Sequence, residues 1–175
     1  MIRKAVRADI PAIEQVMRAS VLGLGAPFYD QQQVLSAAEH ITVPDDQLID
    51  DGTFFVVKEA GRIIACGGWS KRRKLYTGSA EQAKIEGLLD PATDAARIRA
   101  MFVDPAFARR GIGRLILEAS EADARRAGFT RLELMATLPG VPLYQACGYE
   151  EVESATIDLT DGVKLGGVIM RKRVR

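Results

Sequence analysis

The sequence predicts one α/β (α+β) domain over residues 1–175, with a mixed central sheet of about six to seven strands and about four helices. Its length fits a single domain. In the second half a strand-like run, a helix-like run and another strand-like run follow one another, an order that predicts two parallel strands joined by a right-handed crossover. Elsewhere, short glycine-containing turns separate neighbouring β-rich runs, which predicts antiparallel hairpins in the same sheet.

Composition excludes several classes of protein. The chain has 24 Lys+Arg and 23 Asp+Glu, a net charge of +1, with 47% hydrophobic and 27% charged residues. These shares are those of a globular protein, and a near-neutral charge argues against general nucleic-acid or membrane-surface binding. No apolar run approaches the roughly 20 residues of a membrane helix, and the N-terminal segment lacks the apolar block of a signal peptide. We therefore expect a cytoplasmic protein with neither a nucleic-acid nor a membrane partner.

The first half predicts two helices and three strands. Residues 2–6 alternate like a strand, and Asp9 followed by Pro11 is typical of a helix start. After the break GLGAPFYD a second helix is expected near residues 30–40. The β-rich runs 53–58 and 62–69 flank a turn at 59–61 and predict a hairpin. Residues 70–96 are polar and without a period, which predicts a long connection of the kind that is often functional.

The second half is more regular. We expect a strand at 97–103, an amphipathic helix at 112–126 that Gly128 ends, and a strand at 131–136. A short helix in LYQAC follows, ending at Gly148. Two last strands are expected at 152–159 and 164–174, joined by Asp161-Gly162. The sequence leaves open whether the last strand pairs with a second copy across an exposed edge to form a homodimer.

Cysteine and histidine usage limits the chemistry. Cys66 and Cys147 are far apart and lack a CxxC spacing, so we expect free thiols in the core rather than a disulfide or a zinc site. His40 is the only histidine, which excludes a histidine-rich metal site. It lies in an expected helix with no nucleophile motif nearby, so a surface or capping role is preferred. We expect no metal ion.

The segment VDPAFARRGIGR at 103–114 carries the strongest chemical signal. It leaves a strand, turns at Pro105 and starts a helix with two glycines and several arginines. Glycines let a ligand approach the backbone, and unpaired N–H groups at a helix N-terminus attract anions. These features predict a pyrophosphate cradle, although neither a P-loop nor a dinucleotide fingerprint is present. The alternative is a basic helix start whose glycines serve packing.

The segment RIRAMFVDPAFARRGIGRLIL, followed by RLELMATLPGVPLYQACGYEEV, resembles the two central motifs of the GNAT superfamily of acyl-CoA N-acyltransferases. The resemblance covers residues 97–152 and implies a GNAT-like fold with acetyl-CoA as co-substrate. It implies that the coenzyme pyrophosphate is bound by the backbone of Arg109, Arg110, Gly111, Ile112, Gly113 and Arg114. It also implies that the pantetheine arm pairs with the backbone of Met101, Phe102 and Val103.

Tyr144 has the position of the tyrosine in the family's Tyr-x-x-x-Gly-aromatic element, with Gly148 and Tyr149 after it. The resemblance implies that Tyr144 protonates the departing thiolate. A positioned phenol with a pKa of about 10 is able to do so. The alternative is a tyrosine whose ring anchors a short helix.

Three positions depart from the family pattern. Ala108 stands where a Gln or Arg usually opens the glycine turn, and Pro139 stands where many members have an asparagine. Each puts one coenzyme contact in doubt. Arg97 replaces a glutamate that serves several members as general base, so the proton of the attacking amine needs another route.

Glu133 is the best remaining candidate for that base. It lies on the strand beside the expected site, while its neighbours Leu132 and Leu134 point to the other face. Two alternatives stay open: a carboxylate paired with Arg99 or Arg131, or a chain of waters that removes the proton.

The acceptor is the least determined part. Phe28, Tyr29, Trp69 and Tyr76 could line an amine pocket, although such aromatic residues more often belong to the core. The basic run 71–74 could attract an anionic acceptor or the 3′-phosphate of the coenzyme, or could be a solvated charge run. The sequence does not decide between a small-molecule and a peptide amine.

Together these observations predict an N-acetyltransferase that moves an acetyl group from acetyl-CoA to a primary amine by direct attack. The alternative is a non-catalytic acyl-CoA-binding sensor or regulatory module, which the departures at Arg97, Ala108 and Pro139 motivate. A nucleotide-binding protein is disfavoured because the Lys and acidic partners that it requires are absent.

Overall fold

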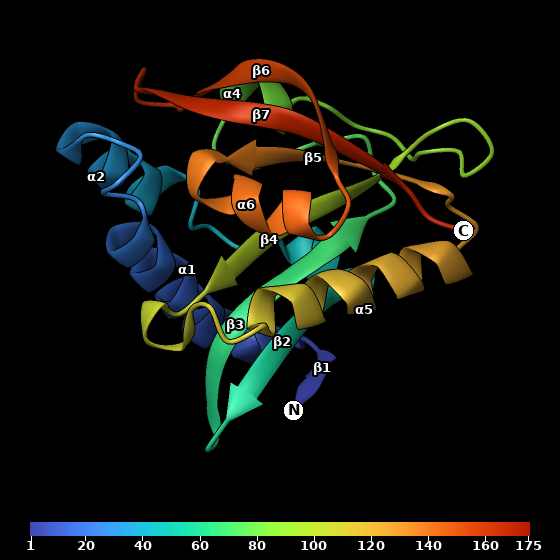
Figure 1. The fold of residues 1–175 in the computed structure, drawn as a ribbon, viewed down its shortest axis with the longest axis horizontal. Coiled ribbons are helices and arrows are strands. Elements are labelled where there is room, and N and C mark those ends of the chain that lie inside the picture. Colours follow the sequence, from blue (N-terminus) through green and yellow to red (C-terminus); the bar gives the residue numbers. More distant parts are fainter.

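Seven strands form one mixed sheet in the computed structural model, which describes residues 1–175 (Figure 1). The strand order is β1-β2-β3-β4-β5-β7-β6, and only the β4–β5 pair is parallel. The strands are β1 (Ile2–Lys4), β2 (Phe54–Glu59), β3 (Arg62–Ser70), β4 (Ala96–Val103), β5 (Arg131–Thr137), β6 (Glu150–Asp158) and β7 (Lys164–Arg173). The mixed sheet and its parallel pair confirm the predicted fold class.

The helices number six rather than four. They are α1 (Ile10–Leu24), α2 (Gln31–His40), α3 (Asp46–Asp50), α4 (Ala80–Ala83), α5 (Ile112–Arg126) and α6 (Val141–Ala146). The two that the sequence did not predict, α3 and α4, are single turns too short to show an apolar period. Side chains cap both, because Asp45 accepts a hydrogen bond from the backbone of Gln47 and Ser79 accepts one from that of Gln82. None of the six is long and apolar enough to cross a membrane.

Helices cover both faces of the sheet (Figure 1). On one face α5 packs against β2, β3 and β4, and its Ile116 and Leu117 belong to one buried cluster with Leu132 and Leu134 of β5. On the other face α1 packs against β3 and β4, and α2 adds a smaller apolar cluster with β6 and β7. Because side chains alternate along a strand, residues 131, 133 and 135 of β5 point away from α5.

Strands β4 and β5 separate soon after they begin (Figure 1). They pair only at Ala96↔Leu132 and Arg97↔Glu133. Beyond this point the β5-facing backbone groups of β4 have no strand partner. Strand β4 also bulges against β3 at Ala100, which has a φ of +55°. The parallel pair therefore opens into a gap, closed at the start of β4 and open at its end.

The strand order shows whether the last strand, β7, has a free edge that could pair with a second copy. Strand β7 pairs with β5 on one side and with β6 on the other, so it has no free edge for a second copy. The edge strands are β1 and β6. Glutamates and a bulge between Glu151 and Glu153 mark β6, and both features disfavour pairing with another chain. Edge-to-edge pairing of β7 with a second copy is therefore excluded.

Candidate active site

The turn between β4 and α5 has an unusual backbone. Arg109 and Gly111 both adopt left-handed conformations, with φ of +60° and +78°. Only three non-glycine residues of the chain have a positive φ, and two of them, Ala100 and Arg109, flank the end of β4. A side-chain-bearing residue pays about 1–2 kcal/mol for this conformation. Such strain is characteristic of functional segments.

This turn leaves six consecutive backbone N–H groups, from Arg109 to Arg114, without an acceptor in the protein. A helix N-terminus alone leaves four such groups. The next residue, Leu115, donates the first backbone hydrogen bond of the helix, to the Gly111 carbonyl. No side chain caps the helix, so its positive end is also uncompensated. The arrangement is an anion site made of backbone donors.

Helix α6 lies beside this turn. A Cβ added to Gly113 would lie 3.0 Å from Leu143 of α6, so glycine allows the two helices to approach. Arg114 donates to the carbonyl of Ala146 at 3.3 Å. Arg110 stands at the rim, where it stacks on the ring of Phe107 and lies 3.6 Å from Glu59.

Tyr144 of α6 is buried, with 8% of its surface exposed. Its ring packs edge-on against Tyr149, with 5.7 Å between centroids, and closely against Gly140. Its hydroxyl makes no hydrogen bond to the protein. Burial raises the pKa of Tyr144 well above the ordinary value for a phenol. Tyr144 therefore keeps its proton at neutral pH and is restricted to donating it.

Glu133 lies at the closed end of the gap, held by two arginines. Arg97 Nη1 donates to Glu133 Oε1 at 3.1 Å, and Arg171 Nε donates to Oε2 at 2.6 Å. The suggested pairing with Arg99 or Arg131 is wrong, since Arg99 is bonded elsewhere and Arg131 donates to the carbonyls of residues 92 and 93. Both partners come from neighbouring strands. Each carboxylate oxygen accepts one of these bonds and keeps a free lone pair, so Glu133 can still accept a proton, although two neighbouring guanidinium charges favour its ionised form.

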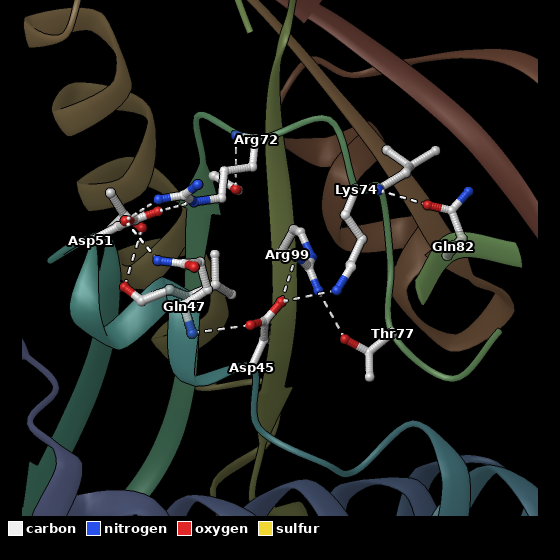
Figure 2. Close-up of polar contacts among 12 residues, drawn as sticks. Asp45, Gln47, Asp51, Arg72, Lys74, Thr77, Gln82 and Arg99 are labelled. Atoms are coloured by element: carbon white, nitrogen blue, oxygen red, sulfur yellow. Dashed lines mark hydrogen bonds and ion pairs between the residues drawn. The ribbon is translucent and has the colours of Figure 1, made fainter. Parts of the chain in front are cut away.

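A second polar cluster covers β4 next to its bulge (Figure 2). Arg99, which is 4% exposed, donates to Asp45 at 3.1 Å and to Thr77 at 2.8 Å. Burial lowers the pKa of Arg99, and the Asp45 carboxylate opposes this effect. Lys74 lies 4.0 Å from Asp45. The cluster ties the segment before α3 and the segment after β3 to the same strand.

The basic run 71–74 lies at the start of β4, because β3 is antiparallel to β4 and Ser70 pairs with Arg97. This is the opposite end of β4 from the glycine turn. The placement argues against a contact with the 3′-phosphate of a coenzyme held at that turn. Within the run, Arg72 forms two hydrogen bonds to Asp51, at 2.8 and 2.9 Å (Figure 2).

The four aromatic candidates do not form one group. The Tyr29 hydroxyl donates to the carbonyl of Gly166 at 2.7 Å and accepts from the N–H of Leu138, which ties it to β7 and to the end of β5. Tyr29 and Tyr76 both pack on the cluster between α2 and β6–β7, and Phe28 is half-exposed. Trp69 lies on the other face, buried beneath α5.

Other side chains have structural roles. The Trp69 indole donates to Asp123 at 2.9 Å and its ring packs on Phe129, so Trp69 belongs to the core. His40 is the last residue of α2, and its side chain contacts the β6–β7 turn rather than the helix end, with Nδ1 2.9 Å from the Thr160 hydroxyl and Nε2 3.3 Å from Asp161. Cys66 is a buried free thiol and Cys147 a half-buried one.

Two charged residues of these clusters were absent from the sequence-based candidates. Asp45 lies in a segment with no period, and Arg171 lies in a strand that the sequence did not place beside β5. In the sequence each is a single charged residue outside any recognisable motif. Neither could be found without the strand order.

The comparisons with known proteins agree with this geometry. The sequence model of the Acetyltransferase (GNAT) family matches residues 24–149. A GCN5-related N-acetyltransferase of Rhodopseudomonas palustris has a TM-score of 0.76 at 18% identity, over 99% of this chain and 95% of that one. The PaiA N-acetyltransferase of Thermoplasma acidophilum, solved with coenzyme A, has a TM-score of 0.67 at 15% identity, over 99% and 98%.

The putative acetyltransferase YncA of Salmonella typhimurium, solved with acetyl-CoA, has a TM-score of 0.64 at 19% identity, over 100% of this chain and 94% of that one. At these identities the structural matches establish the fold. No curated protein sequence matches the chain. The family match spans most of the domain, including the turn that follows β4 and the Tyr144 helix, and the chain therefore belongs to the GNAT family of acetyltransferases, a family of acyltransferase enzymes.

Proposed function

We propose that the protein transfers an acetyl group from acetyl-CoA to a primary amine by direct attack of the amine on the thioester. The observation that carries this proposal is the run of six unpaired N–H groups at residues 109–114, at the open end of the β4–β5 gap. The coenzyme-bound structures of the T. acidophilum and S. typhimurium proteins support the choice of co-substrate.

The residues of the turn fit a pyrophosphate. Consecutive N–H groups and an uncapped helix N-terminus favour an anion with several acceptor oxygens. The absence of a side chain at Gly111 leaves the backbone open, Gly113 allows α6 to approach the turn, and Arg109 and Arg110 add positive charge at the rim. The free backbone groups of β4 at Met101, Phe102 and Val103 would pair with the amide-bearing arm. Acetyl-CoA supplies the acetyl thioester.

The reaction needs one proton donor and one proton acceptor. The amine nitrogen forms a bond to the acetyl carbon while the carbon–sulfur bond breaks, and the sulfur leaves with the electron pair of that bond. Tyr144, which remains protonated, donates its proton to this sulfur. The amine loses its proton to Glu133 or to a chain of waters. Positioning and polarisation by backbone donors supply the rest of the rate enhancement.

Thermal unfolding with and without acetyl-CoA tests the binding step. Ligand at 100 times its Kd should stabilise the fold by about 2.7 kcal/mol, which raises the midpoint by roughly 5–10 °C for a domain of this size. Coenzyme A lacking its 3′-phosphate, ATP and NAD serve as controls. An equal shift with ATP or NAD, or none with acetyl-CoA, would overturn the proposed ligand.

Release of free thiol from acetyl-CoA in the presence of a panel of amines tests the transfer. Thiol release that depends on the amine supports the transferase. A specific midpoint shift without any thiol release would instead favour the acyl-CoA sensor, the alternative that Arg97 motivates by standing where several family members have a catalytic glutamate.

A further inference from the structure

Three charged side chains form a row across three neighbouring strands at the closed end of the gap. Arg97 of β4 is registered opposite Glu133 of β5, and Glu133 is registered opposite Arg171 of β7. They lie on the face away from α5, because Leu132 and Leu134 occupy the α5 face. The pair Arg97↔Glu133 is the last register position before β4 and β5 separate. A pantetheine arm that ran along β4 from the glycine turn would therefore extend toward this row.

Most of the hydrogen-bonding capacity of this row is unused. A guanidinium has five N–H donors, and Arg97 and Arg171 each give one hydrogen bond to Glu133. The Nε of Arg97 is buried and has no partner. The Arg97 side chain is 18% exposed and that of Arg171 is 58% exposed, and both line the adjoining cavity. An anion in this cavity would satisfy several of their free donors at once.

The row lines a cavity of about 780 Å³ with a surplus of positive charge. Its basic side chains are Arg97, Arg131, Arg171, Lys172 and Arg173. Its acidic side chains are three, which leaves a net charge of +2. The whole chain carries only +1, so the rest of the molecule is slightly negative. The surplus of positive charge in this cavity therefore does not follow from the overall charge of the chain.

We infer that the acceptor is an amine that also carries an anionic group, a carboxylate or a phosphate ester, held by the free donors of Arg97 and Arg171. This inference rests on the proposed transferase function and specifies its substrate class. The anion would occupy the cavity, while the amine end points into the β4–β5 gap. Glu133 keeps the two guanidinium groups apart and oriented.

Matched pairs of amines test the inference through thiol release from acetyl-CoA. O-phosphoethanolamine is compared with ethanolamine, and γ-aminobutyrate with γ-aminobutyramide, at equal concentrations of the unprotonated amine. The anionic member of at least one pair should have a kcat/KM about tenfold or more above that of its neutral partner, because hydrogen bonds between charged groups are the strong ones. The two pairs separate a phosphate site from a carboxylate site.

Variants locate the effect. Arg97→Gln and Arg171→Gln should each remove most of the preference by raising the KM for the anionic amine relative to that for the neutral one. Because both residues also bond to Glu133, the readout is the ratio between paired amines within each variant. Arg171→Lys, which keeps the charge, should retain part of it. The control is Arg126→Gln, an exposed position at the far end of α5, which should keep the full preference. Arg171→Lys also covers the case in which a glutamine variant does not fold.

A binding measurement separates the two proposals. With coenzyme A present, O-phosphoethanolamine should raise the midpoint of the native protein above that with ethanolamine, and Arg97→Gln should abolish the difference. If this holds while no amine is acetylated, the ligand class stands and the transferase proposal fails. The inference is overturned if amines are acetylated without a charge preference, if the preference survives both substitutions, or if neither turnover nor midpoint distinguishes the paired amines.

Discussion

The two ends of β4 present different chemical groups to a ligand. Beyond its C-terminal end, six consecutive backbone N–H groups have no acceptor in the protein. At its N-terminal end, guanidinium and carboxylate side chains from β4, β5 and β7 bond to one another. Donors of the first kind come from adjacent residues and need only a local turn. Donors of the second kind need an assembled sheet, because Arg97 and Arg171 lie 36 and 38 positions from Glu133 in the sequence.

The largest effect is expected at the N-terminal end, on replacing Arg99 by methionine. Asp45 would lose its buried partner, which should cost about 3 kcal/mol of the free energy of unfolding, the lower part of the range for buried pairs because Asp45 retains some exposure. The midpoint would fall by roughly 6–12 °C. Thermal unfolding measures this loss, while the shift produced by acetyl-CoA at the other end should persist.

Arg126→Met is the matched control for Arg99→Met. Its side chain is 70% exposed, so removing its ion pair with Asp123 should change the free energy of unfolding by less than about 1 kcal/mol. Equal losses in the two variants would show that the buried pair at β4 contributes no special stability.

The next effect concerns the chemistry at the open end. Tyr144→Phe should lower turnover by about 10²-fold while leaving the acetyl-CoA midpoint shift nearly unchanged, because only the proton donor is removed. Steady-state thiol release measures it. Tyr149→Phe is the control, since it alters the neighbouring ring of the same edge-on pair and removes a buried hydroxyl without a partner. Unchanged turnover in Tyr144→Phe would remove Tyr144 from the mechanism.

The smallest effect sharpens the role of the backbone at the turn. Gly111→Ala places a side chain at a φ of +78° with no atom within 4 Å, so the cost is conformational and about 1–2 kcal/mol. Gly162→Ala in the β6–β7 turn, at a φ of +88° and equally open, should lose a similar amount. Only Gly111→Ala should also reduce the acetyl-CoA midpoint shift. If both variants keep the full shift, the geometry of residue 111 does not govern coenzyme binding.

Local patterns predicted much of the fold. The apolar period of α5 and the glycine that follows it gave its bounds correctly, and the hairpin between β2 and β3 turns at Ala60 and Gly61, both left-handed as such a turn requires. The single-turn helices α3 and α4 escaped detection because one turn contains no repeat. The bulge at Ala100 escaped as well, since alanine carries no preference for a positive φ.

The arrangement of the last strands shows the limit of such patterns. Each of β6 and β7 was expected from its residues, yet β7 lies between β5 and β6 and not at an edge. Pairing between β5 and β7 joins residues 30 to 42 positions apart, from Thr137↔Gly167 to Arg131↔Arg173, and no turn specifies it. The partners of Glu133 follow from this order, which is why the suggested partners were wrong.

The sequence by itself determined the helix and strand segments, the glycine turn after β4 and the family resemblance, because a helical period, a left-handed glycine and a run of free N–H groups depend on residues a few positions apart. Only the tertiary structure decided the strand order, the gap between β4 and β5, the burial of Trp69 and the partners of Arg99 and Glu133. These contacts join distant segments, and their energies exist only after the sheet has brought the segments together.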